Sequence, residues 1–136
     1  MSDAAISYRT SPFVSTGDLN ELFSVTREGH APRNFDPVLR RSLTYICAYR
    51  NEWLVGFVNV AWDGGGHAFL LDTTVRPELR LRGIGRELVR RAAAEARERG
   101  VEWLHVDFEP DLRPFYDSCG FRATEAGQMR LAAGPR

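Results

Sequence analysis

The apolar periodicity of this chain changes across a glycine-containing turn near its middle. Residues 67–75 before the turn are typical of a strand, whereas apolar residues after it recur at helical spacing from Ile84 to Ala96. Gly100 is expected to end this helix, and a further strand is predicted over 103–108. A strand, a helix and a second strand in this order indicate a parallel crossover.

The segment before the turn is typical of an antiparallel meander. Strands are predicted over 45–49 and 53–62, joined by a tight turn, and the Asp63-Gly64-Gly65-Gly66 turn leads into the strand over 67–75. A shorter strand is expected over 6–9. We therefore predict an α/β fold in which a mixed, mostly antiparallel central sheet is flanked by helices.

Two helices are expected ahead of the meander. Thr16 or Asp18 can cap the first, and Asp36-Pro37 has the cap-then-proline signature of a second that runs to about Leu43. No repeat or linker divides residues 1–136, so one domain is expected. The segments predicted after the last long strand are a short helix over 112–119 and a closing hairpin of 121–124 and 128–131.

Composition excludes several classes of protein. The 136 residues include 18 arginines, no lysine and 18 acidic residues, so the formal net charge is zero. Without lysine the chain can form neither a Schiff base nor a Walker-type phosphate loop, and a neutral chain is unlike a typical nucleic-acid-binding domain. Cys47 and Cys119 lack metal-ligand spacing, so we expect no metal site and no disulfide.

The chain has no apolar run of membrane-spanning length, and its first residues lack the pattern of a signal peptide. We therefore expect a soluble, cytoplasmic protein without a membrane partner. Charge is distributed unevenly along the sequence. Between Arg76 and Arg99 there are eight arginines and four glutamates, so the remainder is acidic. That acidic remainder favours a cationic ligand there.

The turn between the predicted strand and the long helix suits an anion. Glycines allow a ligand to approach the backbone, and the first N–H groups of a helix carry partial positive charge. Arg80, Arg82 and Arg86 could add charge-assisted hydrogen bonds. A dinucleotide fingerprint is excluded because Leu88 stands where its third glycine is required. An ordinary loop with solvated arginines is the other interpretation of an isolated Gly-x-Gly.

Two longer motifs decide between these interpretations. The segment Val75-Arg76-Pro77-Glu78-Leu79-Arg80-Leu81-Arg82-Gly83-Ile84-Gly85 resembles the signature with which the GNAT superfamily of N-acetyltransferases binds the pyrophosphate of CoA. The segment Phe115-Tyr116-Asp117-Ser118-Cys119-Gly120-Phe121 resembles a second family motif near the carboxyl end. The resemblance covers about residues 53–121. The positions seven and four residues before Tyr116, where many members have Asn and Ala, are Glu109 and Leu112.

The resemblance implies an enzyme that uses acetyl-CoA as co-substrate and acetylates a primary amine by direct attack in a ternary complex. It implies that Tyr116 protonates the departing thiolate, and that the main chain of Thr73 and Val75 holds the pantetheine arm and thioester. The residues implied at the pyrophosphate are Arg80, Leu81, Arg82, Gly83, Ile84, Gly85 and Arg86. The acceptor would be a small-molecule or peptide amine, and a homodimer is a family-based expectation.

The general base is harder to predict. Only about a thousandth of a lysine-like amine is neutral at pH 7.4, so a base or water relay is needed. Strand alternation puts His67 on the same face as Val75 and Asp72 on the opposite face, where a structural role is expected. His105, Asp107 and Glu109 alternate along one face of the predicted strand over 103–108 and its extension, so they could accept protons directly or through water. His67, Asp107 and Glu109 are therefore the candidates, although each alone is more typical of a structural residue.

A second class of function also fits the sequence. Phe69 and Leu71 give the strand over 67–75 an apolar face, which a partner protein could cover. A non-catalytic acyl-CoA-binding regulatory module with the same fold is therefore the alternative to the enzyme.

Overall fold

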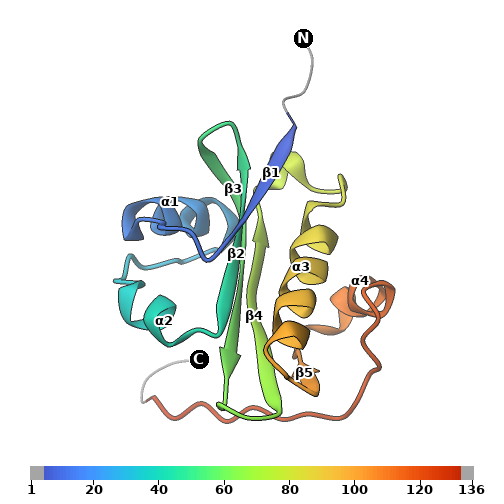
Figure 1. Cartoon of the computed structure of the whole chain (residues 1–136). Helices are drawn as coiled ribbons and strands as arrows, with labels where there is room; N and C mark the ends of the chain where they lie inside the picture. Colours follow the sequence, from blue (N-terminus) through green and yellow to red (C-terminus); the bar gives the residue numbers. More distant parts are fainter. Residues whose placement is uncertain (1–4, 133–136) are drawn as a thin grey trace. The chain divides into compact units, whose positions relative to one another are not determined.

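The computed structural model describes residues 5–132, which form two compact units divided after Val106. The first unit contains a five-stranded sheet with α1 and α2 on one face and α3 on the other (Figure 1). Its elements are β1 (Ile6–Thr10), α1 (Thr16–Thr26), α2 (Asp36–Arg41), β2 (Thr44–Arg50), β3 (Trp53–Trp62), β4 (His67–Val75), a 3-10 turn η1 (Pro77–Leu79), α3 (Ile84–Glu98) and β5 (Trp103–His105).

The strands lie in sequence order, β1-β2-β3-β4-β5. The first three pairings are antiparallel, and β4 pairs with β5 in parallel after the crossover through α3. The predicted fold class is therefore confirmed: the protein is an α/β protein with a mixed, mostly antiparallel sheet flanked by helices.

Local sequence explains most element boundaries. Ser15 caps α1 by accepting a hydrogen bond from the Asp18 N–H at 3.0 Å, so the helix begins one position earlier than a Thr16 cap would give. At the other end of the crossover, Gly100 adopts a left-handed φ of 83° and ends α3, as expected. Helix α2 ends at Arg41, two residues before the predicted end.

The core lies on both faces of the sheet. Helix α3 presents one apolar stripe to the sheet, where Leu88 and Ala92 are fully buried. On the opposite face Phe23 of α1 stacks on Phe35 with ring centroids 5.4 Å apart, and Phe57 of β3 completes this aromatic cluster. The sheet is thus held between two packed layers of side chains.

Strand β4 contains a β-bulge that changes which face its side chains occupy. Between the pairs Asn59↔Leu71 and Phe57↔Thr74, β4 advances three residues while β3 advances two, and Asp72 has a left-handed φ of 61°. Leu71 shares the α1 face with Asn59, as expected from direct pairing. After the bulge that face holds Thr74, which pairs with Phe57.

Val75 therefore lies on the α3 face, where it pairs with Gly56, whose added Cβ would lie 3.1 Å from Leu88 of α3. His67, Phe69 and Leu71 lie on the other face. The prediction that His67 and Val75 share a face is wrong, because strict alternation does not anticipate an extra residue in the strand.

Strand β5 is shorter than predicted. It covers Trp103–His105 and pairs only with residues 67–69 of β4. Asp107 and Glu109 thus lie beyond the strand, and the prediction that they alternate along it is wrong. Pro110 begins the helical turn η2 and has no N–H for a sheet, so the strand could not have continued past Glu109.

The second unit contains η2 (Pro110–Leu112) and α4 (Arg113–Ser118). The short helix predicted over 112–119 is thus present. The predicted closing hairpin is wrong, because residues 121–132 form no strand. Residues 122–132 are exposed, including the large apolar side chains of Met129 and Leu131, and a two-stranded hairpin alone is marginally stable.

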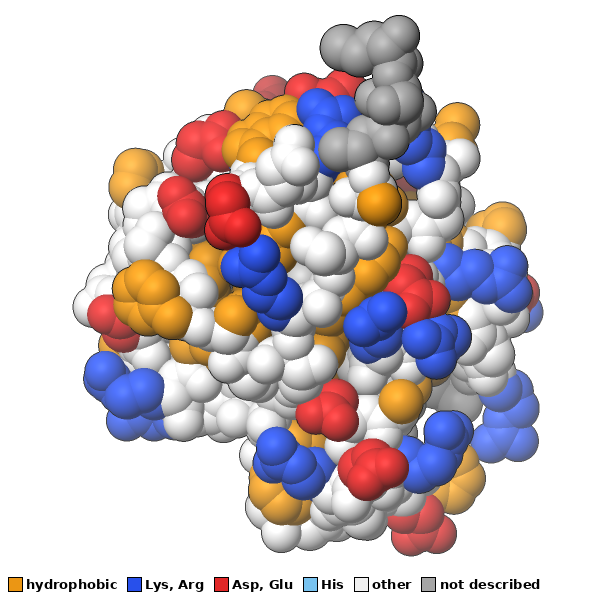
Figure 2. All heavy atoms as spheres, turned by 45° about the horizontal axis from the view of Figure 1, so that its top comes forward, with side chains coloured by type: hydrophobic (Ala, Val, Ile, Leu, Met, Phe, Trp, Pro, Cys, Tyr) orange, Lys and Arg blue, Asp and Glu red, His pale blue; other side chains and the backbone are white. Residues whose placement is uncertain are grey.

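The surface carries charges of both signs. Figure 2 shows arginine and acidic side chains interspersed over the face in view. On α3, Glu87 pairs with Arg90 and Arg91, three and four residues further on. These contacts lower the pKa of Glu87 to about 2, chiefly through the hydrogen bond from Arg90.

Candidate active site

The backbone reverses sharply between β4 and α3. Leu81, a fully exposed residue, has a φ of 64°, and Gly83 has a φ of 80° as the N-cap of α3. Among the described residues 5–132, no side chain caps this helix, and its first internal hydrogen bond runs from the Glu87 N–H to the Gly83 oxygen at 3.0 Å. The preceding N–H groups, those of Ile84, Gly85 and Arg86, therefore form a positive helix terminus suited to an anion.

An arginine links this turn to the end of β4. Arg80 is exposed, and its Nε donates to the carbonyl oxygen of Val75 at 3.3 Å. Arg82 and Arg86 are also exposed and belong to the same turn and first helical residues. Three arginines thus belong to the turn and the first residues of α3.

The backbone of β4 is open on one side next to this turn. The Arg76 N–H donates to the Val55 oxygen of β3 at 2.9 Å. Because alternate residues of a strand direct their N–H groups to opposite neighbours, Val75 directs its N–H away from β3. On that side, β5 pairs only with residues 67–69 in the sheet of the first unit. The site can therefore offer the Val75 N–H to an extended ligand.

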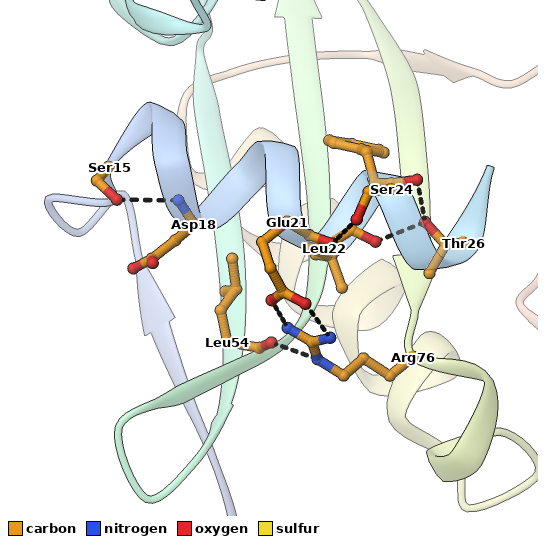
Figure 3. Close-up of polar contacts among 9 residues, drawn as sticks. Ser15, Asp18, Glu21, Leu22, Ser24, Thr26, Leu54 and Arg76 are labelled. Carbon is orange, nitrogen blue, oxygen red and sulfur yellow. Dashed lines mark hydrogen bonds and ion pairs between the residues drawn. The ribbon is translucent and has the colours of Figure 1, made fainter. Parts of the chain in front are cut away.

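Arg76 has a structural role that the sequence did not reveal. Its side chain is 3% exposed, and its Nε donates to the Leu54 oxygen at 2.9 Å. Both terminal nitrogens contact the Glu21 carboxylate, with Nη1 at 3.0 Å from Oε2 (Figure 3). The guanidinium also lies 4.2 Å from the centroid of the Trp53 ring. The hydrogen bond from Arg76 lowers the pKa of Glu21.

The candidate bases are distributed over the chain. His67 is exposed at the start of β4, and its Nδ1 lies 2.8 Å from Nε2 of His105. Eight residues separate His67 from Val75, which corresponds to roughly 25 Å along a strand. The structure therefore does not bring His67 to the end of β4. Asp107 and Glu109 are both exposed in the second unit, and Asp107 accepts a hydrogen bond from Gln128.

Tyr116 belongs to α4 of the second unit. Its side chain is buried among Phe108, Phe115 and Phe121, with ring centroids 4.8, 4.9 and 5.8 Å away. The Phe121 N–H donates to the Tyr116 carbonyl oxygen at 3.1 Å. The aromatic residues of the second motif thus fix the position of the tyrosine ring within its unit.

A pocket of about 310 Å³ lies beside the bulge of β4. Arg27 at the end of α1 forms an ion pair with Asp72 of the bulge, Nη1 to Oδ1 3.0 Å. Sequence reasoning selected none of the polar residues of this pocket, because no motif marks them. The residues that line it are Phe23, Arg27, His30, Ala31, Arg33, Phe35 and Asp72.

Two negative observations concern the described residues only. Among residues 5–132, no helix has the length and apolar character needed to span a membrane. Within the same range, no cluster of three or more His, Cys, Asp or Glu side chains is arranged to hold a metal ion.

The turn at the start of α3 contains the segment that resembles the CoA-binding signature of the GNAT superfamily. The model of the Acetyltransferase (GNAT) family matches residues 15–121. The chain belongs to this family.

Individual relatives agree with this assignment. The chain is 32% identical over 124 residues to a chloroplastic serotonin N-acetyltransferase of rice. The aligned region covers 83% of this chain and 59% of the rice protein. The chain thus spans less than two thirds of the length of such sequence relatives.

Solved structures show the same fold. A GNAT family acetyltransferase from Streptococcus pneumoniae TIGR4 superposes with a TM-score of 0.78 at 21% identity, covering 94% of this chain and all of that one. An aminoglycoside N-acetyltransferase in complex with CoA gives a TM-score of 0.74 at 16% identity, covering 95% of each chain.

Proposed function

We propose that this protein transfers an acetyl group from acetyl-CoA to a primary amine by direct attack in a ternary complex. The observation that carries the proposal is the open backbone edge of β4 at Val75, directly next to the arginine-glycine turn. Acetyl-CoA has an extended amide-containing arm joined to a pyrophosphate. A strand edge for the arm beside an anion-binding turn for the pyrophosphate suits this ligand.

The residues at the turn fit such a ligand. The N–H groups at the start of α3 and the guanidinium groups of Arg80, Arg82 and Arg86 would hold the pyrophosphate through charge-assisted hydrogen bonds. The main chain of Thr73 and Val75 would pair with the amides of the pantetheine arm. Acetyl-CoA supplies an activated thioester when it is bound.

Two groups of this chain would act on the reaction. The Val75 N–H would polarise the thioester carbonyl, and preorganised donors of this kind contribute strongly to acyl transfer. The Tyr116 hydroxyl would donate its proton to the departing thiolate, because a phenol is protonated at neutral pH. Removal of the amine proton would fall to Asp107 or Glu109, directly or through water, because His67 lies at the far end of β4 from Val75.

The proposal is tested by measuring CoA release from acetyl-CoA across a panel of primary amines. Tyr116→Phe removes one hydroxyl and should lower kcat by about 100-fold or more, the range of general acid catalysis, while the Kd for CoA stays the same. Arg80→Ala should instead raise the Kd for CoA about tenfold. Arg40→Ala, which changes an exposed arginine on α2, is the matched control and should change neither value.

One outcome would favour the non-catalytic module. If the wild-type protein binds CoA and releases none from acetyl-CoA with any amine, the acetyl-transfer proposal is wrong. The half-exposed Phe69 and Leu71, at 42% and 39%, would then mark the surface that contacts a regulated partner. If neither Arg80→Ala nor Gly85→Glu changes CoA affinity, the assigned phosphate site is wrong.

A further inference from the structure

The pocket beside the β4 bulge has an excess of positive charge. Two arginines, Arg27 and Arg33, line it, and Asp72 is the one carboxylate among its lining residues. Asp72 is paired with Arg27, so the charge of Arg33 is not balanced within the pocket. In residues 5–132, the Arg33 guanidinium makes no ion pair or hydrogen bond, and its contact is the Phe35 ring, 4.6 Å from the centroid.

Both guanidinium groups lie on aromatic rings, and within residues 5–132 only that of Arg27 also has an acidic partner, Asp72. Arg27 lies 4.6 Å from the centroid of the Phe23 ring, as Arg33 does from Phe35, and these two rings stack on each other. A guanidinium on an aromatic face keeps its N–H groups at the ring edges available to an oxygen ligand. The stacked pair Phe23 and Phe35 therefore supports both arginines from one fixed platform.

The loop that carries Arg33 is also held in place. Asn20 of α1 accepts from the Arg33 N–H at 3.1 Å and donates to the Arg33 carbonyl oxygen at 2.8 Å. The same Asn20 oxygen lies 2.8 Å from Nε2 of His30, so this imidazole nitrogen carries the proton. Asn20 thus fixes both ends of the segment from His30 to Arg33, and the pocket is formed before any ligand binds.

The pocket lies next to the reacting centre that we propose. Asp72 is three residues before Val75 on β4, a separation of roughly 10 Å along a strand. A small molecule in a pocket of about 310 Å³ could therefore extend its amine toward the end of β4. The other end of that molecule would meet Arg33 and Arg27.

From this arrangement we infer that the acceptor is a small primary amine that also carries an anionic group, a carboxylate or a phosphate. Arg33, with Arg27 beside it, binds the anionic group, and the amine extends toward the end of β4. The inference rests on the proposed acetyl transfer and adds the acceptor class. It also replaces the sequence-based expectation of a cationic acceptor. The acidic residues responsible for that expectation are spread over the remaining chain, whereas the pocket itself has a positive excess.

The test compares amines in matched pairs that differ in the anionic group. Glucosamine 6-phosphate is compared with glucosamine, and tyrosine with tyramine, which separates a phosphate preference from a carboxylate preference. One charge-assisted hydrogen-bonded contact should give the anionic member about a 10-fold to 100-fold higher kcat/KM. Arg33→Gln should remove at least about tenfold of this advantage and change the neutral member less than about twofold.

Further variants and a binding measurement complete the design. Gln at position 33 keeps the main-chain hydrogen bonds to Asn20, and Arg40→Gln is the matched control. Asp72→Asn suits the left-handed backbone at this position and removes the negative charge. Calorimetry with inorganic phosphate at saturating CoA should show binding weakened by Arg33→Gln and strengthened several-fold by Asp72→Asn.

The outcomes distinguish this inference from acetyl transfer. Equal kcat/KM for both members of each pair, or an equal effect of Arg33→Gln on both, overturns the inference and leaves acetyl transfer intact. Turnover of no amine, with phosphate binding that depends on Arg33, overturns acetyl transfer and supports the anion site. Phosphate affinity that is the same in the wild type and both pocket variants, without an anionic preference in turnover, overturns the inference.

Discussion

Arg76 offers the sharpest test of how the first unit is held together. Arg76 directly follows β4, and its guanidinium donates to the Leu54 oxygen of β3 and pairs with Glu21 of α1. The side chain therefore joins three elements. Arg76→Met keeps an unbranched apolar chain of similar length and removes the charge and all side-chain donors, while the main-chain N–H can still donate to the Val55 oxygen. The result should be a less stable protein with the same fold.

The magnitude follows from the three contacts. Losing the donor leaves the Leu54 carbonyl without this partner, which costs about 1–3 kcal/mol. The contact with the Trp53 ring contributes about 0.5–2 kcal/mol. The Glu21 side chain is 53% exposed, so its ion pair is discounted to below about 1 kcal/mol. The substitution also removes the desolvation cost of burying the guanidinium charge, and this gain offsets part of the summed loss. We expect a net loss of about 2–3 kcal/mol, which lowers Tm by roughly 6–12 °C.

Thermal and urea unfolding followed by circular dichroism measure this loss. Arg9→Met is the matched control, because Arg9 also has an acidic partner, Glu52, and an aromatic ring, Tyr49, but is 43% exposed. The control should lose less than about 1 kcal/mol. Equal losses in the two variants would refute the reasoning that burial gives the Arg76 contacts their strength.

Acid should reduce the effect of the Arg76 substitution. The folded-state pKa of Glu21 is lowered by the hydrogen bond from Arg76. A carboxyl of this kind contributes stability above its unfolded pKa and loses it as pH falls through the folded pKa. The difference in unfolding free energy between wild type and Arg76→Met should therefore shrink below about pH 4. A difference that is constant from pH 7 to pH 2 would contradict the role of Glu21.

Three further predictions concern other parts of the first unit. Gly56→Ala should cost about 1–3 kcal/mol in urea unfolding, because its Cβ would lie 3.1 Å from Leu88, whereas Gly17→Ala, with no atom nearer than 3.8 Å, should cost nothing. Cys47 is fully buried and burial raises its pKa to about 12, so at pH 8 it should react with a thiol reagent only after urea is added. Glu87→Gln should lower stability at pH 7 by less than about 1 kcal/mol. Because the folded pKa of Glu87 is lowered to about 2, that difference should fade between about pH 4.5 and pH 2 in acid titrations of unfolding.

Elements with strong local signals could be predicted from the sequence. The meander strands β2 and β3 and the strand β4 were expected almost at their observed ends, because Asn51 and the Asp63 to Gly66 turn interrupt apolar runs. Helix α3 was expected because its apolar stripe repeats over four turns and Gly100 ends it. The arginine-glycine turn at its start was predicted for the same reason, since the motif is local.

Features that depend on tertiary pairing could not be predicted in this way. The bulge at Asp72 is defined by the register of β4 against β3, and an aspartate within a strand segment does not by itself specify an extra residue. The burial of Arg76 requires Glu21, which is 55 positions away. The pocket with Arg27 and Arg33 requires a helix end and a loop to meet a strand. These contacts form only when the elements pack.

The bulge is a point at which the length of β4 can change by one residue without turning the residues that follow it. Removal of one residue at position 72 or 73 would restore regular alternation along the strand. Thr74 would still pair with Phe57 and Val75 with Gly56, so Val75 would stay on the α3 face. A one-residue deletion elsewhere in β4 would instead turn the residues on one side of it to the opposite face. Proteins related to this one by small insertions or deletions should therefore be aligned at the bulge before their site residues are compared.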